Sequence, residues 1–507
     1  MLVPQPMSVT YAPGSFRLDT ASTVRAPEPI AALLRELLTP ATGLPLPSTD
    51  GEATLAFSLD PAIGSSEEFR LRVSADSVRV SAGGLAGLRW AVHTLRQLLP
   101  AAAFGSSFAP RESWSLPFVE IVDRPRYAWR GAMLDVGRWY KPVPWLHTLV
   151  DLIAMHRMNV LHLHLTEDQG WRFEVKRYPR LTSVGAYRRS SPAGHEVEGR
   201  DDGQAHGGYY TQEELRALVA YADRRGVTIV PEIDLPGHAQ AAIAAYPELG
   251  NDPSARHEVW TRFGISPHVL NTDDTTVDFM AAVLDELMNV FPAPFIHLGG
   301  DEVPTTEWAA NPAAQARMAA LGLTDPGQLL PWWISQLSSH VRARGRTPVV
   351  WDELVGAGDA VIMAWRGQDR VVEALAAGHR VVAAPHTHLY LNYPASNDPG
   401  EPLSIAAGGS PHVDASPLSK MYGYRPEPPG YTQPAGAGDA AIIGIQANLW
   451  TEYAATPARA EYDLMPRLAA VAEVAWGTAG DEADLRERLK HHLRRLDHAG
   501  VTYRPLD

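Results

Sequence analysis

The stretch Val160-Leu161-His162-Leu163-His164-Leu165 is a short apolar run, and the polar residues Thr166, Glu167 and Asp168 follow it at once. A run of this length is typical of a buried strand, and helical patterns separate most of the similar runs along the chain. Eight such strands alternating with helices predict an α/β fold, the (β/α)8 or TIM barrel. The eight runs are residues 131–136, 160–165, 228–234, 295–298, 348–351, 361–365, 380–384 and 442–446.

A separate unit precedes the barrel. Residues 69–73 and 77–81 alternate between apolar and polar side chains, which predicts a β-hairpin. Apolar residues at helical spacing predict a helix over 85–99, and the segment 101–115 is predicted to be a linker or an exposed loop. We therefore expect a small α/β domain over residues 1–122. The barrel domain, over residues 123–507, is expected to carry the functional site and to end in a charged amphipathic helix at 485–496.

Composition excludes several classes of protein. The chain has 507 residues, of which 45% are hydrophobic and 20% charged, and it has no cysteine. It can therefore form no disulfide and no thiolate metal site. The net charge of −14 disfavours binding to nucleic acid, and no apolar run predicts a membrane span. The N-terminus lacks the pattern of a signal peptide, so we expect a cytoplasmic protein, or a secreted one if a leader has been removed.

Polar and aromatic side chains follow the predicted strands, at the face where barrels build their sites. Carboxylates bind hydroxyl groups, and tryptophan stacks on the apolar face of a sugar ring. Taken singly, such a carboxylate is often a helix N-cap, and a tryptophan is usually a core residue. Together they predict a cleft for a neutral, polyhydroxylated ring. The residues are Asp135, Arg138, Glu167, Asp168, Asp234, His238, Asp301, Glu302, Trp351, Asp352, Trp365, Tyr390, Asn392, Trp450 and Glu452.

The central pair is Asp301-Glu302, which follows Gly299 and Gly300. The glycines permit a sharp turn and a close approach of the backbone to a ligand. Adjacent carboxylates repel, so a shared site is expected to raise the pKa of one of them into the range of a general acid. The alternative is a solvated loop with an acidic N-cap.

Two histidine pairs have a spacing that suits metal ligands on one strand face, His162 with His164 and His386 with His388. Apolar residues surround the first pair, which favours core histidines with satisfied hydrogen bonds. A metal-dependent barrel hydrolase that uses these pairs stays an alternative. The expectation is that the protein has no metal and no cofactor.

Five motifs, in order, resemble the family 20 glycoside hydrolases, the β-N-acetylhexosaminidases. The resemblance runs from about residue 123 to residue 476, and residues 1–122 look like the family's N-terminal α/β domain. The motifs are Asp135 with Arg138, His162-Leu163-His164-Leu165-Thr166-Glu167-Asp168-Gln169-Gly170-Trp171, Pro231-Glu232-Ile233-Asp234-Leu235-Pro236-Gly237-His238, His297-Leu298-Gly299-Gly300-Asp301-Glu302 and Asn448-Leu449-Trp450-Thr451-Glu452.

The resemblance implies an exo-acting, retaining hydrolase that releases terminal β-linked N-acetylglucosamine or N-acetylgalactosamine from an oligosaccharide, such as a chitin fragment, or from a glycoconjugate. The nucleophile is then the substrate's own acetamido group. Glu302 is implied to be the general acid and base, Asp301 to orient the acetamido N–H, and Tyr390 to bind the acetamido oxygen. Asp234 is implied to support Glu302 together with His238. Substrate binding is implied for Arg138, Glu167, His238, Trp351, Trp365, Asn392, Trp450 and Glu452.

Two positions depart from the family pattern. Glu167 stands where an aspartate is usual, and its extra methylene displaces the carboxylate. Asn392 stands where an aspartate usually contacts the sugar, and the lost negative charge leads us to expect tolerance of a 6-sulfated sugar. The Pro- and Gly-rich insertion at 395–440 is the expected determinant of leaving-group preference. A catalytically silent, sugar-binding relative is the non-enzyme alternative.

Overall fold

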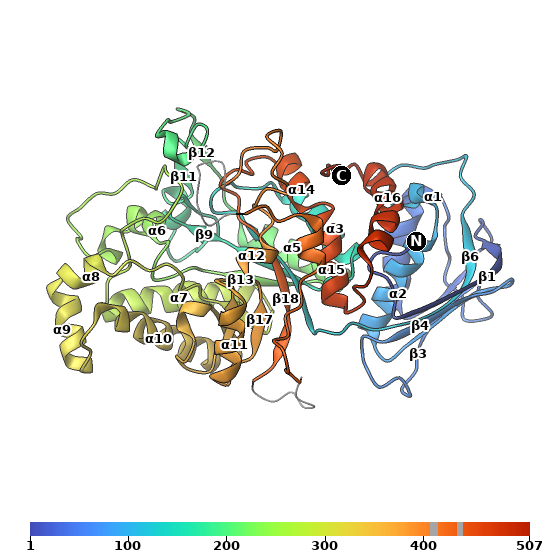
Figure 1. Ribbon diagram of the computed structural model, residues 1–507, viewed down its shortest axis with the longest axis horizontal. Helices are drawn as coiled ribbons and strands as arrows, with labels where there is room; N and C mark the ends of the chain where they lie inside the picture. The colour runs from blue at the N-terminus through green and yellow to red at the C-terminus, as the bar shows by residue number, and fades with distance from the viewer. Residues whose placement is uncertain (406–413, 433–439, 507) are drawn as a thin grey trace.

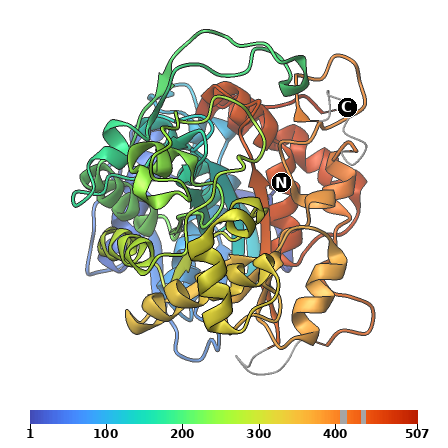
Figure 2. The same cartoon turned by 90° about the vertical axis from the view of Figure 1, so that its left-hand side faces the viewer.

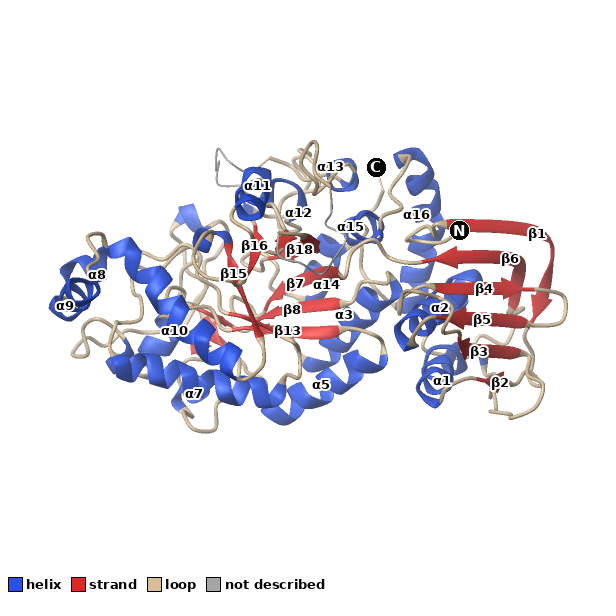
Figure 3. Cartoon of the chain, turned by 90° about the horizontal axis from the view of Figure 1, so that it is seen from below, coloured by secondary structure: helices blue, strands red, loops and turns tan. Residues whose placement is uncertain are grey.

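A computed structural model describes residues 1–405, 414–432 and 440–506 of the chain. A sheet domain and a barrel lie side by side along the long axis of the molecule (Figure 1). In the sheet domain the predicted hairpin is confirmed, because β4 and β5 pair antiparallel. The six strands, in the order β1-β6-β4-β5-β3-β2, carry both long helices of the domain on one face (Figure 3). The elements are β1 Ser8–Arg17, β2 Val24–Arg25, α1 Glu28–Thr42, β3 Leu55–Leu59, β4 Phe69–Val73, β5 Val78–Ala82, α2 Leu85–Leu98 and β6 Ser115–Asp123.

One expectation for this domain needs correction. The segment 101–115 is not an exposed loop throughout, because Ala101–Phe104 forms a short 3-10 helix, η1, whose last three residues are buried. The C-terminal helix α16, Glu482–Ala499, packs against η1, with the Arg495 guanidinium 5.9 Å from the centroid of the Phe104 ring. The helix predicted at 485–496 is thereby confirmed.

The predicted barrel is confirmed. All eight predicted strands form one closed parallel sheet in the order β13-β14-β15-β16-β17-β18-β7-β8. The barrel wall is packed on both sides, so its strands are almost entirely buried, as their apolar sequences predict. The strands are β7 Trp129–Asp135, β8 Val160–His164, β13 Thr228–Glu232, β14 Phe295–His297, β15 Thr347–Trp351, β16 Val361–Ala364, β17 Val381–Ala383 and β18 Ile442–Leu449.

Helices surround the strands, and longer connections rise on the side away from the sheet domain (Figure 2). Only the short η5, Asp352–Leu354, joins β15 to β16, as their close spacing predicts. The long helices are α3 Val143–Met155, α5 Gln212–Arg224, α7 Asp274–Val290, α9 Pro312–Leu321, α10 Leu329–Ala343, α11 Gln368–Ala376, α14 Pro457–Leu464 and α15 Arg467–Trp476. The shorter elements are β9 Thr166–Glu167, β10 Gly170–Trp171, α4 Arg180–Ser183, β11 Tyr187–Arg188, η2 Glu196–Glu198, β12 His206–Gly207, α6 Gln240–Ala245, η3 Pro247–Leu249, α8 Thr306–Ala310, η4 Pro326–Gln328, α12 His386–Leu389 and α13 Leu418–Tyr422.

Buried polar contacts join the two units. Asp123, the last residue of β6, forms an ion pair with Arg157 and accepts a hydrogen bond from Trp476 Nε1 at 2.8 Å. Arg130 at the start of the barrel pairs with Glu67 of the sheet domain at 2.8 Å. These contacts fix the small domain against the barrel. Within the described residues, every helix is too short or too polar to cross a lipid bilayer.

Candidate active site

A cavity of about 420 Å³ opens at the carboxyl ends of the barrel strands. Its lining contains every residue to which the family resemblance assigns a role, except Glu167 and Asp234. Three other strand-end residues that we expected in the cleft, Asp135, Asp168 and Asp352, are buried outside the lining. The structure therefore brings together residues that are up to 314 positions apart in the sequence, from Arg138 to Glu452. The predicted residues in the lining are Arg138, His238, Asp301, Glu302, Trp351, Trp365, Tyr390, Asn392, Trp450 and Glu452.

The backbone between β14 and Asp301 makes the predicted sharp turn. Gly299 and Gly300 have φ angles of 67° and 97°, and Glu302 also adopts a left-handed conformation, with φ 53°. A Cβ atom on Gly299 would lie 1.7 Å from Asp234 Oδ1, so only glycine fits there. The same Asp234 oxygen accepts a hydrogen bond from the Gly300 N–H at 3.2 Å. Asp234 thus holds the turn that presents the carboxylate pair, and its support of Glu302 together with His238 stays a prediction.

The two carboxylates differ in exposure. The Glu302 side chain is 37% exposed toward the mouth of the cavity, whereas that of Asp301 is only 9% exposed. Burial, with a further contribution from the charge of Glu302, raises the pKa of Asp301 to about 6. The carboxyl with the raised pKa is therefore the deeper Asp301.

His238 lies between the carboxylate pair and Glu167. Its Nε2 atom is 3.7 Å from Glu302 Oε2 and 3.8 Å from Asp301 Oδ2, and its Nδ1 atom donates to Glu167 Oε2 at 3.1 Å. Burial opposes a charge on this ring, but the carboxylates of Glu167, Asp168 and Glu302 together outweigh that effect and raise the pKa of His238 well above its usual value. His238 is therefore an imidazolium that faces both carboxylates of the cavity.

Glu167 lies behind the cavity wall, so its predicted direct contact with a sugar is replaced by a supporting role. Its carboxylate is buried against Arg138 Nη1, at 2.8 Å, and against His164 Nε2, at 3.3 Å, as well as His238. Burial raises the pKa of a lone carboxyl, but Arg138 and His238 hold the pKa of Glu167 well below its usual range. Its longer side chain spans three cationic groups at once.

Aromatic side chains form the inner wall of the cavity. The ring centroids of Trp351 and Trp450 lie 6.0 Å apart, and Trp365 is nearly parallel to Tyr390, with centroids 6.3 Å apart. The indole Nε1 of Trp365 donates to Glu353 Oε2 at 3.2 Å. Burial, together with the charge of Asp301, raises the pKa of Glu353 to about 8. Sequence reasoning missed Glu353, although it follows the strand-end pair Trp351-Asp352.

Five buried polar atoms of the lining residues lack a hydrogen-bond partner among the described residues, and three of them are Arg138 Nε, His238 Nε2 and Asp301 Oδ1. The other two are Glu452 Oε2 and Asn392 Oδ1. Buried polar atoms are nearly always hydrogen-bonded, so such atoms in a cavity wall indicate where a polar ligand binds. Arg138, also buried in the lining, adds a guanidinium to this end of the cavity.

The outer rim is apolar. Val197 and Ile265 are 71% and 45% exposed, and Phe263 and Ile405 lie beside them in the lining. The described rim therefore comes mainly from the connections after β8 and β13, which sequence reasoning did not single out. Of the insertion at 395–440, residues 406–413 and 433–439 lie outside the described residues, so its predicted influence on the leaving group stays a prediction.

The two histidine pairs have different surroundings. His162 and His164 lie on β8, are fully buried and contact Glu232 of β13, as expected of core histidines. The prediction that His386 and His388 share a strand face is wrong, because β17 ends at Ala383 and both residues lie in α12. Residues two apart in a helix point to nearly opposite sides, which separates the imidazoles. Among the described residues, the groups close enough to hold a metal do not include this second pair.

Comparisons with known proteins agree with this geometry. Residues 127–479 match the sequence model of the glycosyl hydrolase family 20 catalytic domain, and residues 1–124 match that of the family's domain 2. The chain belongs to glycoside hydrolase family 20. The β-hexosaminidase of Porphyromonas gingivalis is 37% identical over 99% of this chain, which spans 64% of that protein's length. The β-N-acetylhexosaminidase of Cellulomonas fimi is 32% identical over 99% of this chain and 95% of its own.

Solved family 20 structures have the same fold. The β-N-acetylhexosaminidase from Streptomyces coelicolor aligns with a TM-score of 0.84 at 29% identity, over 100% of this chain and 97% of its own. The exo-β-N-acetylglucosaminidase from Vibrio harveyi, solved with N-acetylglucosamine, aligns with a TM-score of 0.86 at 31% identity, over 99% of this chain and 78% of its own. These matches confirm the resemblance to family 20 glycoside hydrolases and support the predicted β-hexosaminidase class.

Proposed function

We propose that this family 20 protein is an exo-acting β-N-acetylhexosaminidase that works with retention of configuration and uses the substrate's acetamido group as nucleophile. The observation that carries the proposal is the unequal placement of the adjacent carboxylates. Glu302 faces the mouth of the cavity, where a leaving group departs, whereas Asp301 lies deeper, beside the aromatic wall. This arrangement gives the two carboxylates different tasks on one sugar.

The first step breaks the glycosidic bond. Glu302 donates its proton to the glycosidic oxygen, while the acetamido carbonyl oxygen forms a bond to the anomeric carbon. Ionised Asp301 accepts a hydrogen bond from the acetamido N–H and stabilises the positive charge of the cyclic oxazolinium product. Tyr390, which lines the cavity, donates a hydrogen bond from its hydroxyl group to the acetamido oxygen.

The second step releases the sugar. Glu302, now a carboxylate, takes a proton from water, and the resulting hydroxide attacks the anomeric carbon. The bond to the acetamido oxygen breaks, the acetamido group is restored and the sugar leaves with its original configuration. No covalent bond to the protein forms in either step.

The polar and aromatic lining of the cavity supports exo action. Arg138, Asn392 and Glu452 offer charged and amide groups to the hydroxyls of a terminal sugar, and Trp351, Trp365 and Trp450 add aromatic walls. The Arg138 guanidinium lies 5.1 Å from the centroid of the Trp450 ring. A volume of about 420 Å³ lies in the range of small-ligand sites. The aglycone then extends past the apolar rim.

Hydrolysis of 4-nitrophenyl β-N-acetylglucosaminide and β-N-acetylgalactosaminide, with thiazoline inhibition, tests the proposal. Glu302→Gln is expected to lower kcat about 100-fold or more, because the amide cannot donate the catalytic proton. A folded wild-type protein that binds the sugar without turnover would support the silent relative. Loss of activity on adding a chelator would favour the metal-dependent alternative, and trapping a glycosyl adduct on the protein would overturn the mechanism.

We further propose that Asn392 makes the site tolerant of a sulfate at C6 of the sugar. Its neutral amide lines the cavity at a position where family members usually have aspartate, so one source of repulsion toward an anion is absent. Rates on plain and 6-sulfated 4-nitrophenyl N-acetylglucosaminide should differ less for the wild type than for Asn392→Asp. The same ratio in both proteins would contradict the proposal.

A further inference from the structure

Glu232 is a fully buried carboxylate to which the mechanism above gives no task. It is the last residue of β13 and pairs in register with His164 of β8 and with His297 of β14. Residues paired in register on parallel strands point to the same side of the sheet. The barrel therefore places one carboxylate between two histidines, directly beneath the cavity.

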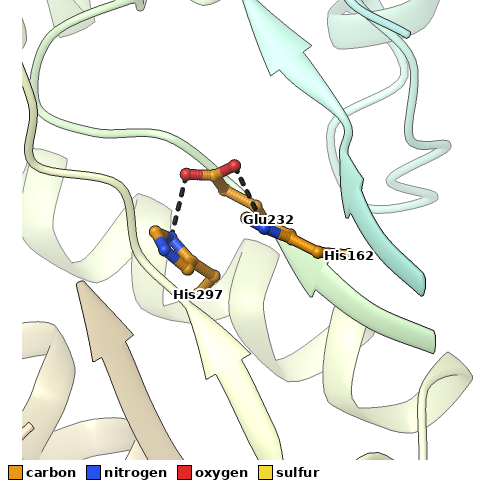
Figure 4. A group of neighbouring side chains, drawn as sticks. All are labelled: His162, Glu232 and His297. Carbon is orange, nitrogen blue, oxygen red and sulfur yellow. Dashed lines mark ion pairs between the residues drawn. The ribbon is translucent and has the colours of Figure 1, made fainter. Parts of the chain in front are cut away.

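The two oxygens of Glu232 serve different neighbours. Oε2 is hydrogen-bonded to His164 Nδ1 and lies 3.0 Å from His162 Nε2. Oε1 accepts a hydrogen bond from the indole N–H of Trp351 at 2.9 Å. The same oxygen lies 2.9 Å from His297 Nδ1, and Figure 4 shows the Glu232 carboxylate between His162 and His297. One side of this carboxylate thus contacts a wall of the sugar cavity, and the other side contacts His164.

His164 connects Glu232 to the catalytic pair. Its second ring nitrogen lies 3.3 Å from Glu167 Oε1, and the other oxygen of Glu167 accepts from His238 at 3.1 Å. His238 in turn faces Glu302 at 3.7 Å. The groups along this path alternate in charge. Neighbouring cationic groups hold the pKa values of Glu232 and Glu167 well below their usual range, in spite of burial. Neighbouring carboxylates raise the pKa values of His164 and His238 well above their usual range, also in spite of burial.

We propose that Glu232 is a positioning residue for the hydrolysis: through His164 and Glu167 it holds His238 against Glu302, and through Trp351 it fixes the wall of the sugar cavity. This inference rests on the proposed function. Without the charge of Glu232, a protonated His164 is a buried cation with one partner fewer, and it is expected to lose its proton. Glu167 then has one cation fewer to hold it in place, and His238 loses its fixed orientation toward the general acid.

Glu232→Gln separates the effect on His238 from the effect on Trp351. The amide oxygen of the glutamine can still accept the hydrogen bond from Trp351, whereas the negative charge that holds His164 is lost. Misplacement of the general acid matters most for leaving groups that need a proton. We therefore expect kcat/KM to fall about ten-fold or more on methyl β-N-acetylglucosaminide. On the 2,4-dinitrophenyl glycoside, whose phenolate leaves unaided, it should fall less than about three-fold. Glu232→Met, which removes both contacts, should also raise KM for both substrates.

Glu473→Gln is the matched control, since Glu473 of α15 is equally buried and is ion-paired with Arg488 of α16, but does not line the cavity. Glu473→Gln should leave the ratio of kcat/KM on the methyl glycoside to kcat/KM on the 2,4-dinitrophenyl glycoside unchanged. A folded Glu232→Gln protein with the wild-type ratio would overturn the inference. If Glu232→Gln fails to fold, His164→Gln interrupts the same path, and an unchanged ratio there also refutes it. A folded wild type that is inactive on both substrates would instead refute the proposed function.

Discussion

Acidification tests the role assigned to Asp301. Burial raises the pKa of this carboxyl to about 6, and only its ionised form can accept the acetamido N–H and stabilise the oxazolinium charge. A group with a raised pKa becomes protonated earlier as the pH falls, so activity should be lost as the pH decreases through about 6. One pH unit below the pKa about 9% of a carboxyl is ionised, and one unit above it about 91%, which predicts an approximately ten-fold lower kcat/KM at about pH 5 than at about pH 7.

The assay is the pH profile of kcat/KM on 4-nitrophenyl β-N-acetylglucosaminide, with circular dichroism at each pH to confirm that the protein stays folded. Asp301→Asn, which cannot titrate, serves as the comparison, and its low residual activity should not fall near pH 6. If the wild type keeps a constant kcat/KM down to about pH 4.5, the raised pKa is refuted. If Asp301→Asn retains the same acid limb, another group is responsible for it.

Two further substitutions test the scaffold. Gly299→Ala places a Cβ atom 1.7 Å from Asp234 Oδ1 and should lower kcat/KM about 100-fold by displacing the carboxylate turn. Gly322→Ala, with a similar φ of 69° but open space around it, should affect only stability; equal activity of the two variants would contradict this reasoning. Asp123→Ala leaves Arg157 buried without its carboxylate and should lower the free energy of unfolding by about 3–5 kcal/mol in a urea titration. A loss below about 1 kcal/mol would show that the pair contributes little.

The barrel could be predicted because each of its strands is an apolar run with polar residues after it. Spacing alone did not predict where the side chains of His386 and His388 point, because residues two apart share a face only if the segment is a strand. The chain there leaves the barrel at Ala384 and turns into α12. A local pattern cannot show where a strand ends when its final residues are also apolar.

The cavity lining was largely predictable, whereas the groups behind it were not. Residues that end strands are expected at one face, which is how Asp301, Glu302 and Trp450 could be placed together. Glu232 is different, since its importance depends on the register of β13 with β8 and β14. Pairing between strands 65 or more residues apart leaves no trace in a single sequence. Glu167 was wrongly expected to line the cavity, because the sequence does not show that it lies in the short β9–β10 hairpin, buried behind the wall.

The left-handed backbone at Glu302 has a consequence for evolution in the laboratory. A non-glycine residue in this conformation costs about 1–2 kcal/mol relative to glycine, and the partly exposed Glu302 side chain recovers little of it by packing. A library screened only for survival after heating should therefore enrich glycine at position 302 and accumulate inactive protein. Selection for hydrolysis must instead retain Glu302, although its backbone conformation disfavours a non-glycine residue. A gain in thermal stability at position 302 is therefore expected to cost catalytic activity.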